Sequence, residues 1–405
     1  MGIVAMHPIQ YHAPIYRHLA KSEKIDLEVL FLDQAGIKVA HDPTMGAAIQ
    51  WDVPLLAGYR SEFLRNWSPV PLGNVVFSRI NPGVVLRIIR ARWDVILIQG
   101  YQPISCWLSI LAARLSGKRI LFRGESCLRC NEGSGWKGVI KRSVLRCVFA
   151  LSDAVLYSCS GNREFFQFYG CPEEKLSSIP CAVDNLFFRQ RRVTDQAEKR
   201  EIRSNLGIRE NIPIVLNVGR MAGLKRQQDL LEAVAALQKQ GLEMATVFVG
   251  DGPAAADLKA IAKTLQIRDV HFVGFVNQSE VSRFYSIADI FTICSEFDPS
   301  PKVVNEALNF ALPLISSDRP GQIGDTILHG TNALVYSCGD VKQLATHLEE
   351  FAQDTQLREK YGKESLRLAD EWSLEADVAS IEQLLDRLLG KGSQTNAQAD
   401  LPKAA

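Results

Sequence analysis

Residues 289–316 constrain the fold most, because they hold one complete succession of strand, helix and strand. The apolar runs at 289–294 and 312–315 predict strands, and the apolar spacing over 303–308 is that of a helix. A unit of this kind belongs to a parallel sheet whose faces are covered by helices.

The same alternation runs through the rest of the chain. It predicts further strands at 2–6, 27–32, 95–99, 119–122, 154–157, 214–219, 246–250 and 270–276. It predicts further helices at 12–21, 82–92, 107–115, 139–151 and 162–169, one that ends at 240, two over 340–369, and one at 374–389 with Ser373 as its N-cap. We therefore expect an α/β fold of doubly wound parallel sheets.

Other segments indicate where the chain divides. Polar, charge-rich residues at 189–203 separate two rounds of alternation, so the boundary is expected near 185–192, with domains at 1–188 and 189–371. Residues 34–66 are expected to be long and irregular, and the turn at 320–324 to lead into a short helix. The polar tail, 391–405, is expected to be disordered.

Composition places the 405-residue chain among soluble globular proteins, with 47% apolar and 22% charged residues. The net charge of +1 divides into +7 over residues 1–190 (22 basic, 15 acidic) and −6 over 191–405 (24 basic, 30 acidic). A basic first half suggests an anionic partner, such as a lipid surface or a phosphate-bearing acceptor. The alternative is that opposite charges simply favour packing of the two halves.

The cysteines and the apolar runs indicate a compartment. Nine scattered cysteines are typical of reduced thiols in a cytoplasm, and Cys127 and Cys130 lack the second pair or nearby histidine of a zinc site. The N-terminus does not resemble a signal peptide, and apolar runs stay short of the ~18 residues of a spanning helix. We expect a cytoplasmic protein, at most peripheral on the inner face of the plasma membrane.

Asp298 and Glu306 are the first candidate site residues. They lie eight residues apart, one in the loop before a helix and the other in its second turn, so both carboxylates can face a crevice at the carboxyl end of a strand. The helix start suits a phosphate and the carboxylates suit hydroxyls, as a nucleotide-sugar would require. The alternative is that Asp298 caps the helix and Glu306 is solvated.

Two turns that follow strands carry further candidates. Arg220 and Lys225 lie between a strand and a helix, where cations beside backbone N–H groups can hold a pyrophosphate. The glycines of Gly250-Asp251-Gly252-Pro253 allow a tight turn close to a ligand. Alternatively, the two cations are exposed surface residues and the glycine turn only separates elements.

The first half offers a charged pair and a basic helix. Arg123 and Glu125 leave a predicted strand, so they are expected at the carboxyl edge of the first sheet. Residues 136–151 combine basic residues with apolar ones in a pattern suited to an anionic membrane surface. The alternative is a packed helix with a solvated basic face.

These motifs together resemble the family 4 type of retaining glycosyltransferases of bacterial surface polysaccharides, which have the GT-B architecture of two facing Rossmann-like domains. The resemblance is strong over residues 214–389 and diffuse before them. The segments that carry it are Gly219-Arg220 with Lys225, Gly250-Asp251-Gly252-Pro253, Phe272-Val273-Gly274-Phe275-Val276, and the Asp298 to Glu306 pair.

The resemblance implies a role for each matching residue. Arg220 and Lys225 would hold the donor diphosphate, Asp298 the transferred sugar and Glu306 the ribose, and these four are the catalytic candidates. Other expected donor contacts are Gly219, Asp251, Gly252, Phe275 and Val276 (the last two at the base), Ser300, Lys302 and Val303. The expected acceptor-side residues are His7, His12, Arg123 and Glu125. Residues 372–390 would cross back to pack on the first domain.

The sequence departs from the family pattern at several positions. Asp298 is one methylene shorter than the usual Glu, and Pro301 has no N–H to offer the sugar. Ala182 replaces a common Asn, residues 7–12 replace the glycine-rich first loop, and Arg123 and Glu125 stand near the place of the family's first-domain His. These changes bear on donor sugar and acceptor rather than on fold.

The leading hypothesis is sugar transfer from a UDP- or GDP-sugar to a glycan or lipid-linked saccharide in polysaccharide biosynthesis. The resemblance implies no metal, no cofactor and no nucleic acid; the possible further partner is an anionic membrane surface. An epimerase-hydrolase of the same fold would be expected to carry more acidic and His residues in the first-domain cleft. A non-catalytic binding relic would have no need to keep Arg220, Lys225 and Glu306.

Overall fold

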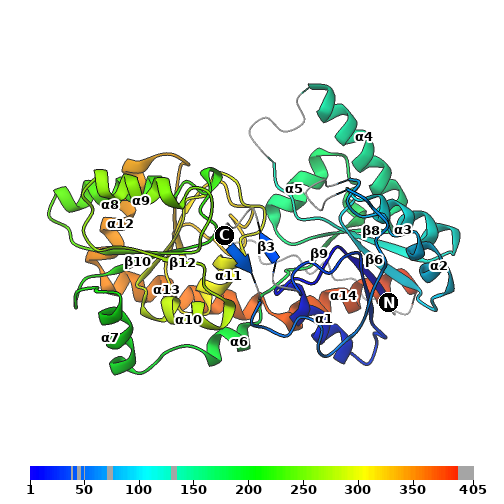
Figure 1. The fold of residues 1–405 in the computed structure, drawn as a ribbon, viewed down its shortest axis with the longest axis horizontal. Helices are drawn as coiled ribbons and strands as arrows, with labels where there is room; N and C mark the ends of the chain where they lie inside the picture. Colours follow the sequence, from blue (N-terminus) through cyan, green and yellow to red (C-terminus); the bar gives the residue numbers. More distant parts are fainter. Residues whose placement is uncertain (38–39, 43–46, 50, 71–75, 129–134, 391–405) are drawn as a thin grey trace.

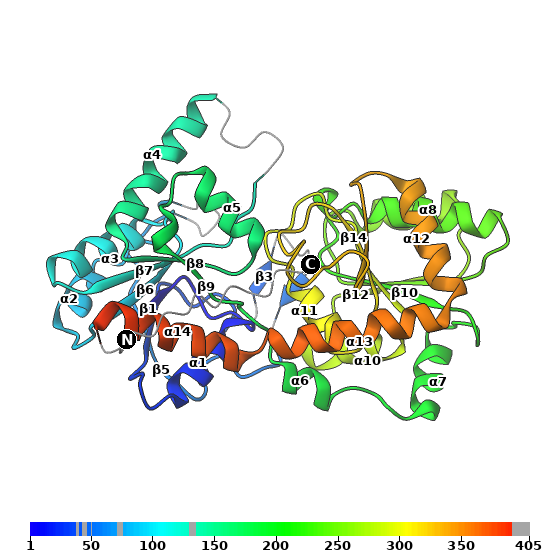
Figure 2. The ribbon, with the colours of Figure 1, turned by 180° about the vertical axis from the view of Figure 1, so that it is seen from behind.

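The computed structural model describes residues 1–37, 40–42, 47–49, 51–70, 76–128 and 135–390. These residues form two lobes that face each other, each built on a parallel sheet with helices on both faces (Figure 1). Two long helices at the C-terminal end run along one side of both lobes (Figure 2). The expected tail at 391–405 lies outside the described residues.

The first lobe is organised around a seven-stranded parallel sheet of order β5-β2-β1-β6-β7-β8-β9. Its central strands β1 and β6 are apolar except for Gln99 at the end of β6, because helices cover both faces of the sheet. The order reverses between β1 and β6, and parallel sheets of this kind commonly bind ligands beside such a reversal. The strands are β1 (Gly2–Ala5), β2 (Glu28–Phe31), β5 (Arg60–Phe63), β6 (Val95–Gln99), β7 (Arg119–Arg123), β8 (Ala154–Tyr157) and β9 (Leu176–Ser178).

Two helical layers enclose this sheet. One layer shares an apolar core with one face and contains α2 (Gly83–Arg90), α3 (Ile104–Leu115), α4 (Gly135–Leu151) and α5 (Ser160–Phe168). On the other face, α1 (His12–Lys21) packs beside α14 (Leu374–Leu389), the last helix of the chain. A short antiparallel pair, β3 (Ala40–Asp42) with β4 (Ala47–Ile49), and a 3-10 turn, η1 (Glu173–Lys175), complete the lobe.

The second lobe has a six-stranded parallel sheet of order β12-β11-β10-β13-β14-β15. Here the strand order reverses between β10 and β13. The strands are β10 (Ile214–Val218), β11 (Ala245–Val249), β12 (Val270–Gly274), β13 (Ile290–Ile293), β14 (Leu314–Ser317) and β15 (Ala333–Tyr336).

The helices of the second lobe also form two layers. α8 (Gln227–Lys239), α9 (Ala255–Thr264) and α12 (Val341–Gln353) cover one face. The other face is covered by α7 (Gln196–Asn205), α10 (Gln278–Ile287), α11 (Lys302–Leu308) and α13 (Thr355–Glu371). A 3-10 turn, η2 (Gly223–Lys225), precedes α8, and α6 (Asn185–Gln190) leads from the first lobe into the second.

The last helix returns to the first lobe, as predicted. Ile381 and Leu384 of α14 are buried in the core of the first lobe. The Asp377 carboxylate accepts the backbone N–H groups of Cys181 at 2.6 Å and Ala182 at 2.8 Å, which ties the helix to the chain that links the lobes. Ser373 caps α14 by accepting from the N–H of Ala376, which confirms the predicted cap.

The structure differs from the expected elements at several points, and it adds the helices α6, α7 and α9, which the sequence analysis did not predict. Residues 34–66 are not wholly irregular, because they contain β3, β4 and β5. Residues 320–330 form turns in place of the expected short helix, and the chain then enters β15, a strand that the sequence analysis missed. β9 was missed as well. The missed strands have only three or four residues, too few to establish a period.

The lobes touch closely where α5 begins. The backbone N–H and the hydroxyl of Ser160 both donate to the Asp325 carboxylate at 2.7 Å. Beside them, the N–H of Gly161 donates to the carbonyl oxygen of Gly321 at 2.9 Å. A Cβ atom on Gly161 would lie 2.6 Å from the Cα of Gly321, so only glycine allows this approach.

Candidate functional site

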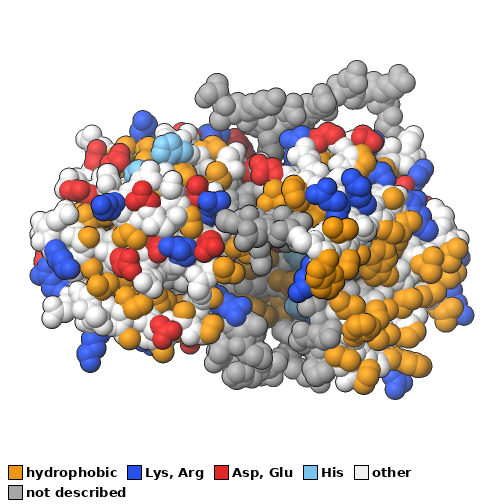
Figure 3. Space-filling model, turned by 90° about the horizontal axis from the view of Figure 1, so that it is seen from above, with side chains coloured by type: hydrophobic (Ala, Val, Ile, Leu, Met, Phe, Trp, Pro, Cys, Tyr) orange, Lys and Arg blue, Asp and Glu red, His pale blue; other side chains and the backbone are white. Residues whose placement is uncertain are grey.

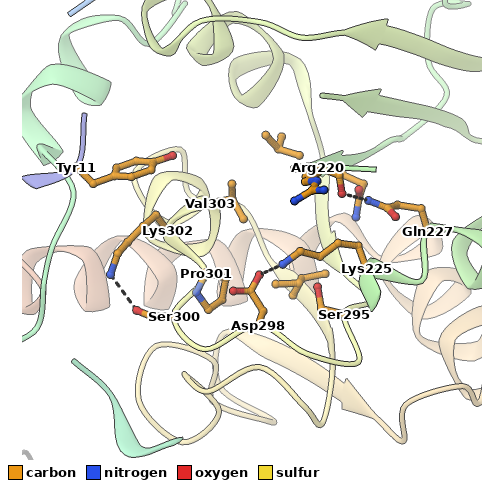
Figure 4. Close-up of a pocket in the computed structure, with 14 residues that line it drawn as sticks. Tyr11, Arg220, Lys225, Gln227, Ser295, Asp298, Ser300, Pro301, Lys302 and Val303 are labelled. Carbon is orange, nitrogen blue, oxygen red and sulfur yellow. Dashed lines mark hydrogen bonds and ion pairs between the residues drawn. The ribbon is translucent and has the colours of Figure 1, made fainter. Parts of the chain in front are cut away.

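A crevice opens in the second lobe where its strand order reverses, at the carboxyl ends of β10 and β13. The start of α11 lies at the same edge. Of the fourteen lining residues, all but Tyr11 belong to the second lobe (Figure 4): Tyr11, Asn217, Val218, Gly219, Arg220, Lys225, Gln227, Ile293, Ser295, Asp298, Ser300, Pro301, Lys302 and Val303.

The turn after β10 brings two cations into the crevice. Gly219, with φ +147°, redirects the chain as it leaves the strand, and Arg220 follows. η2 then places Lys225 on the wall of the same crevice. The carbonyl oxygen of Arg220 accepts from the Gln227 amide at 3.0 Å, which fixes the turn against the start of α8. Both predicted cations therefore face one space.

The Gly250-Asp251-Gly252 turn supports this loop from behind. A Cβ on Gly250 would meet the carbonyl oxygen of Gly219 at 2.1 Å, and one on Gly252 would meet that of Met221 at 2.3 Å. The carbonyl oxygen of Asp251 accepts the N–H of Met221 at 2.9 Å. Asp251 and Gly252 lie outside the set of residues that line the crevice, so their place in this structure is behind the cation-bearing loop.

Lys225 and Asp298 form an ion pair across the crevice, with 2.5 Å between Nζ and Oδ2 (Figure 4). Their side chains are 27% and 16% exposed, so solvent still reaches the pair. The N-cap position of α11 is Pro301, and Asp298 makes no cap there, which excludes the capping alternative. Lys225 and Asp298 therefore neutralise each other in this structure, and their expected contacts with a diphosphate and a sugar hydroxyl stay predictions.

Glu306 is buried, not solvated, and only 2% exposed. Its Oε1 accepts from the hydroxyl of Tyr11, and its Oε2 from the hydroxyl of Tyr285, each at 2.8 Å. Burial raises the pKa of Glu306, while the two hydroxyl donors act in the opposite direction. The predicted ribose carboxylate therefore lies just beneath the crevice, covered by Tyr11.

A second charged cluster lies on the first-lobe side. Arg123 donates to Glu125 at 3.1 Å, and Nζ of Lys302 lies 3.6 Å from the same Glu125 oxygen. Burial opposes ionisation of Glu125, but the charges of Lys302 and Arg123 outweigh it and hold its pKa well below the usual range. Burial also lowers the pKa of His12 to about 3, so this imidazole is neutral. Lys302 lines the crevice of the second lobe and also reaches this first-lobe cluster.

Three of these first-lobe groups have the donor atoms of a metal site. Ligand atoms of His12, Glu125 and Cys181 lie within 4.8 Å of one another. The neutral imidazole suits a metal, but Arg123 and Lys302 already engage the Glu125 carboxylate and would repel a divalent cation. The residues present therefore fit a metal poorly, and the expectation of a metal-free enzyme stays a prediction.

Other predicted residues lie apart from the crevice. His7 is in the first lobe beside Asp33 and Arg79, and burial lowers its pKa. Phe275 packs edge-on against Trp51 of the first lobe, and Val276 packs against the core of the second. Two more predicted residues, Ser300 and Val303, do line the crevice, and their contact with a donor stays a prediction.

The sequence analysis missed several polar residues of the site. Tyr11, Asn217, Gln227 and Ser295 line the crevice, and Cys181 lies in the first-lobe cluster. Asn217 is the one internal polar residue of an apolar strand, a pattern that could have identified it, and its amide donates to the Thr292 carbonyl oxygen at 3.0 Å. Tyr11 offered no such signal, because its partner is 295 residues away.

The crevice-bearing lobe is similar to a known family. Residues 198–367 match the family model of glycosyl transferases group 1. The matched segment lies in the second lobe and contains Arg220, Lys225, Asp298 and Glu306.

Curated relatives match about half of this chain. Alpha-D-kanosaminyltransferase of Streptomyces kanamyceticus is 30% identical over 183 residues, which are 45% of this chain and 47% of the relative. A GDP-mannose-dependent alpha-(1-6)-phosphatidylinositol monomannoside mannosyltransferase of Mycobacterium tuberculosis is 28% identical over 229 residues, 54% and 58% of the two chains. The chain therefore spans about half the length of the curated relatives it matches.

Solved structures match over both lobes. HepE of Anabaena, solved in complex with UDP, superposes with a TM-score of 0.72 at 18% identity, over 96% of this chain and 100% of that one. This likeness, together with the two facing parallel sheets, shows the GT-B fold that the resemblance implied.

Proposed function

We propose that the protein is a retaining, metal-independent glycosyltransferase that moves a sugar from a UDP- or GDP-sugar to a glycan or lipid-linked saccharide in polysaccharide biosynthesis. The observation that carries the proposal is the meeting of Arg220 and Lys225 with Asp298 in one crevice of a group 1 domain. Glu306 lies directly beneath. The set suits a ligand that carries both phosphates and hydroxyls.

The proposed chemistry follows from these charges. When the bond between the anomeric carbon and the diphosphate oxygen breaks, negative charge grows on the departing diphosphate. Arg220 and Lys225 stabilise that charge without a metal, and Asp298 then accepts from a sugar hydroxyl. The acceptor hydroxyl loses its proton to the leaving diphosphate as its oxygen bonds to the same face of the anomeric carbon, which retains configuration. No protein nucleophile is assigned.

The relatives suggest the substrate classes. HepE was solved with UDP, and the mycobacterial relative uses GDP-mannose, so UDP-sugars and GDP-sugars are both reasonable donors. That mycobacterial relative also acts on a phosphatidylinositol mannoside, which supports a lipid-linked acceptor. Arg123, Glu125 and Lys302 face one another on the first-lobe side of the crevice and are the proposed acceptor contacts.

The first test is thermal unfolding with UDP, GDP, ADP and their sugars, with and without EDTA. A bound nucleoside diphosphate stabilises the native state by mass action. The nucleotides of one base should therefore raise Tm more than the others, and EDTA should not change this shift. Arg220→Ala should abolish the shift and lower turnover on the order of a hundredfold. Arg283→Ala, an exposed arginine on α10, is the control. Normal turnover in Arg220→Ala contradicts the proposal.

We also propose that the protein acts at an anionic membrane surface. Among the described residues, no helix has the length and hydropathy needed to cross a bilayer. However, α2, α3 and α4 contain no acidic residue in their sequences, and they carry seven basic ones. Exposed apolar side chains accompany these charges, among them Leu111, Leu115, Trp136 and Val139. Figure 3 shows hydrophobic and basic side chains gathered on the first lobe, seen from above.

The charge of α2, α3 and α4 favours anionic lipid over a second copy of the chain as the partner of this helical layer. Two copies of the chain joined through it would bring like charges together, whereas anionic lipid headgroups would neutralise them. Reversing Lys141 and Arg142 to Glu should therefore abolish co-sedimentation with vesicles that contain anionic lipid. Reversing Lys259 and Lys263 on α9 makes the same charge change on the other lobe and should have little effect. If the variant with Lys141 and Arg142 reversed to Glu sediments as before, α4 is an ordinary packed helix with a solvated basic face.

A further inference from the structure

Tyr11 crosses from one lobe to the other. It stands at the N-cap position of α1 in the first lobe, yet its ring packs against the core of the second lobe and lines the crevice (Figure 4). Its hydroxyl donates to Oε1 of Glu306 at 2.8 Å. One side chain thus joins the first segment of the chain to the buried carboxylate of α11.

This contact supplies a hydrogen-bond donor to Oε1 of the buried Glu306. A buried carboxylate is costly unless donors satisfy its oxygens. Tyr285, from within the second lobe, satisfies Oε2 of Glu306, and Tyr11 satisfies Oε1. A ribose presents hydroxyl groups of the same donor type, so it can replace the Tyr11 hydroxyl at Oε1 at no net loss of hydrogen bonds.

Two further groups of the crevice differ in whether they have a partner. Lys225 is paired with Asp298 at 2.5 Å, which covers the cation proposed for the diphosphate. In the part of the chain that the structure describes, Nε of Arg220 is buried with no hydrogen-bond partner. The crevice thus has one unmatched donor suited to an anion, one cation held by Asp298, and one carboxylate held by Tyr11.

We propose that Tyr11 is a latch that holds the ribose-binding carboxylate in the empty enzyme, and that the donor nucleotide releases it. The inference rests on the proposed function, because it takes the ligand to be a nucleoside diphosphate. Tyr11 belongs to the first lobe, so its release removes one of the contacts between the lobes. Donor binding is thereby coupled to lobe movement, and the nucleotide must compete with Tyr11 for Glu306.

The test is Tyr11→Phe, which keeps the ring and removes only the hydroxyl. A hydrogen bond of this kind contributes roughly 0.5–1.5 kcal/mol, and 1.4 kcal/mol corresponds to a tenfold change in Kd. Titration calorimetry with UDP and GDP should therefore show binding about two to twelve times tighter than in the unmodified protein. Tyr16→Phe is the matched control, because Tyr16 lies on the same helix and donates to Gln99 within the first lobe. The affinity of the Tyr16→Phe variant for UDP and GDP should equal that of the unmodified protein.

Hydrogen exchange supplies a second measurement. Adding the nucleotide to the unmodified protein should speed exchange of amides at 7–12, since the latch opens. Equal affinity in Tyr11→Phe overturns the latch alone and leaves the proposed function intact. Weaker binding also overturns it, because Tyr11 then donates to the nucleotide itself. If neither protein binds UDP, GDP or ADP, the proposed function and the latch fail together.

Discussion

At the scale of single residues, the Lys225–Asp298 ion pair separates two roles that are easily confused. If Asp298 serves only the transferred sugar, Asp298→Asn should lower turnover about a hundredfold, comparable with the loss of one transition-state donor. The same change frees Lys225 from its partner. A partly exposed pair contributes at most about 1 kcal/mol, so affinity for the nucleoside diphosphate should stay the same or rise up to about fivefold.

Turnover and calorimetric affinity, measured on the same Asp298→Asn preparation, check this prediction. Lys225→Met is the companion variant, and it should lose nucleotide affinity because the cation itself is gone. A parallel loss of turnover and affinity in Asp298→Asn would assign Asp298 a structural role in the crevice.

The sequence predicted some site residues better than others, because some of their contacts join residues that are far apart in the sequence. Arg220, Lys225 and Asp298 follow predicted strands, and parallel strands bring their carboxyl ends to one edge, so local pattern was enough. Tyr11 could not be found in this way, because its contact depends on how the lobes face each other. The burial of Glu306 was missed for the same reason, since the covering ring comes from the other lobe.

At the scale of elements, the contact between the start of α5 and the turn at 320–325 should respond to pH. Burial raises the pKa of Asp325 from its ordinary 3.8 to about 6, although the N–H and hydroxyl of Ser160 oppose the shift. The carboxyl therefore binds its proton more tightly with the lobes closed than with the group in water. Closure should strengthen as pH falls from 7.5 to 5 and weaken as pH rises through 6.

Small-angle X-ray scattering can follow this change through the radius of gyration, which should decrease between pH 7.5 and 5. Asp325→Asn, a neutral mimic of the protonated side chain, should remove most of the pH dependence. A dependence that survives in Asp325→Asn would assign the response to other groups.

The same turn explains why an element was predicted wrongly. Its Pro-Gly sequence was expected to lead into a short helix, but the backbone of Gly321 lies against Pro299, where an added Cβ would meet the carbonyl oxygen at 2.3 Å. Gly161 approaches Gly321 from the first lobe. A helix cannot satisfy both contacts, so tertiary packing decides the local conformation. A long periodic segment such as α14, expected at 374–389, was predicted closely, because its pattern spans several turns.

At the scale of the whole molecule, the alternation of strands and helices was enough to predict two doubly wound lobes, but not how they lock together. That arrangement depends on single contacts such as Ser160 with Asp325 and Lys302 with Glu125, which have no periodic signal. One helix also packs on the lobe that it does not follow in sequence. α14 comes after the second lobe, yet it completes the core of the first. The stability of the first lobe therefore depends on residues at the far end of the chain.

Ile381→Ala tests this dependence, because Ile381 is 2% exposed and packs in the core of the first lobe. A buried truncation of this kind costs about 2–5 kcal/mol. Of the six tryptophans, all but Trp372 precede residue 188, so fluorescence reports mainly on the first lobe. In urea, Ile381→Ala should lower the fluorescence midpoint. Leu348→Ala, in the core of the second lobe, should lower it less. An unshifted midpoint in Ile381→Ala would show that the first lobe is stable without the packing of α14.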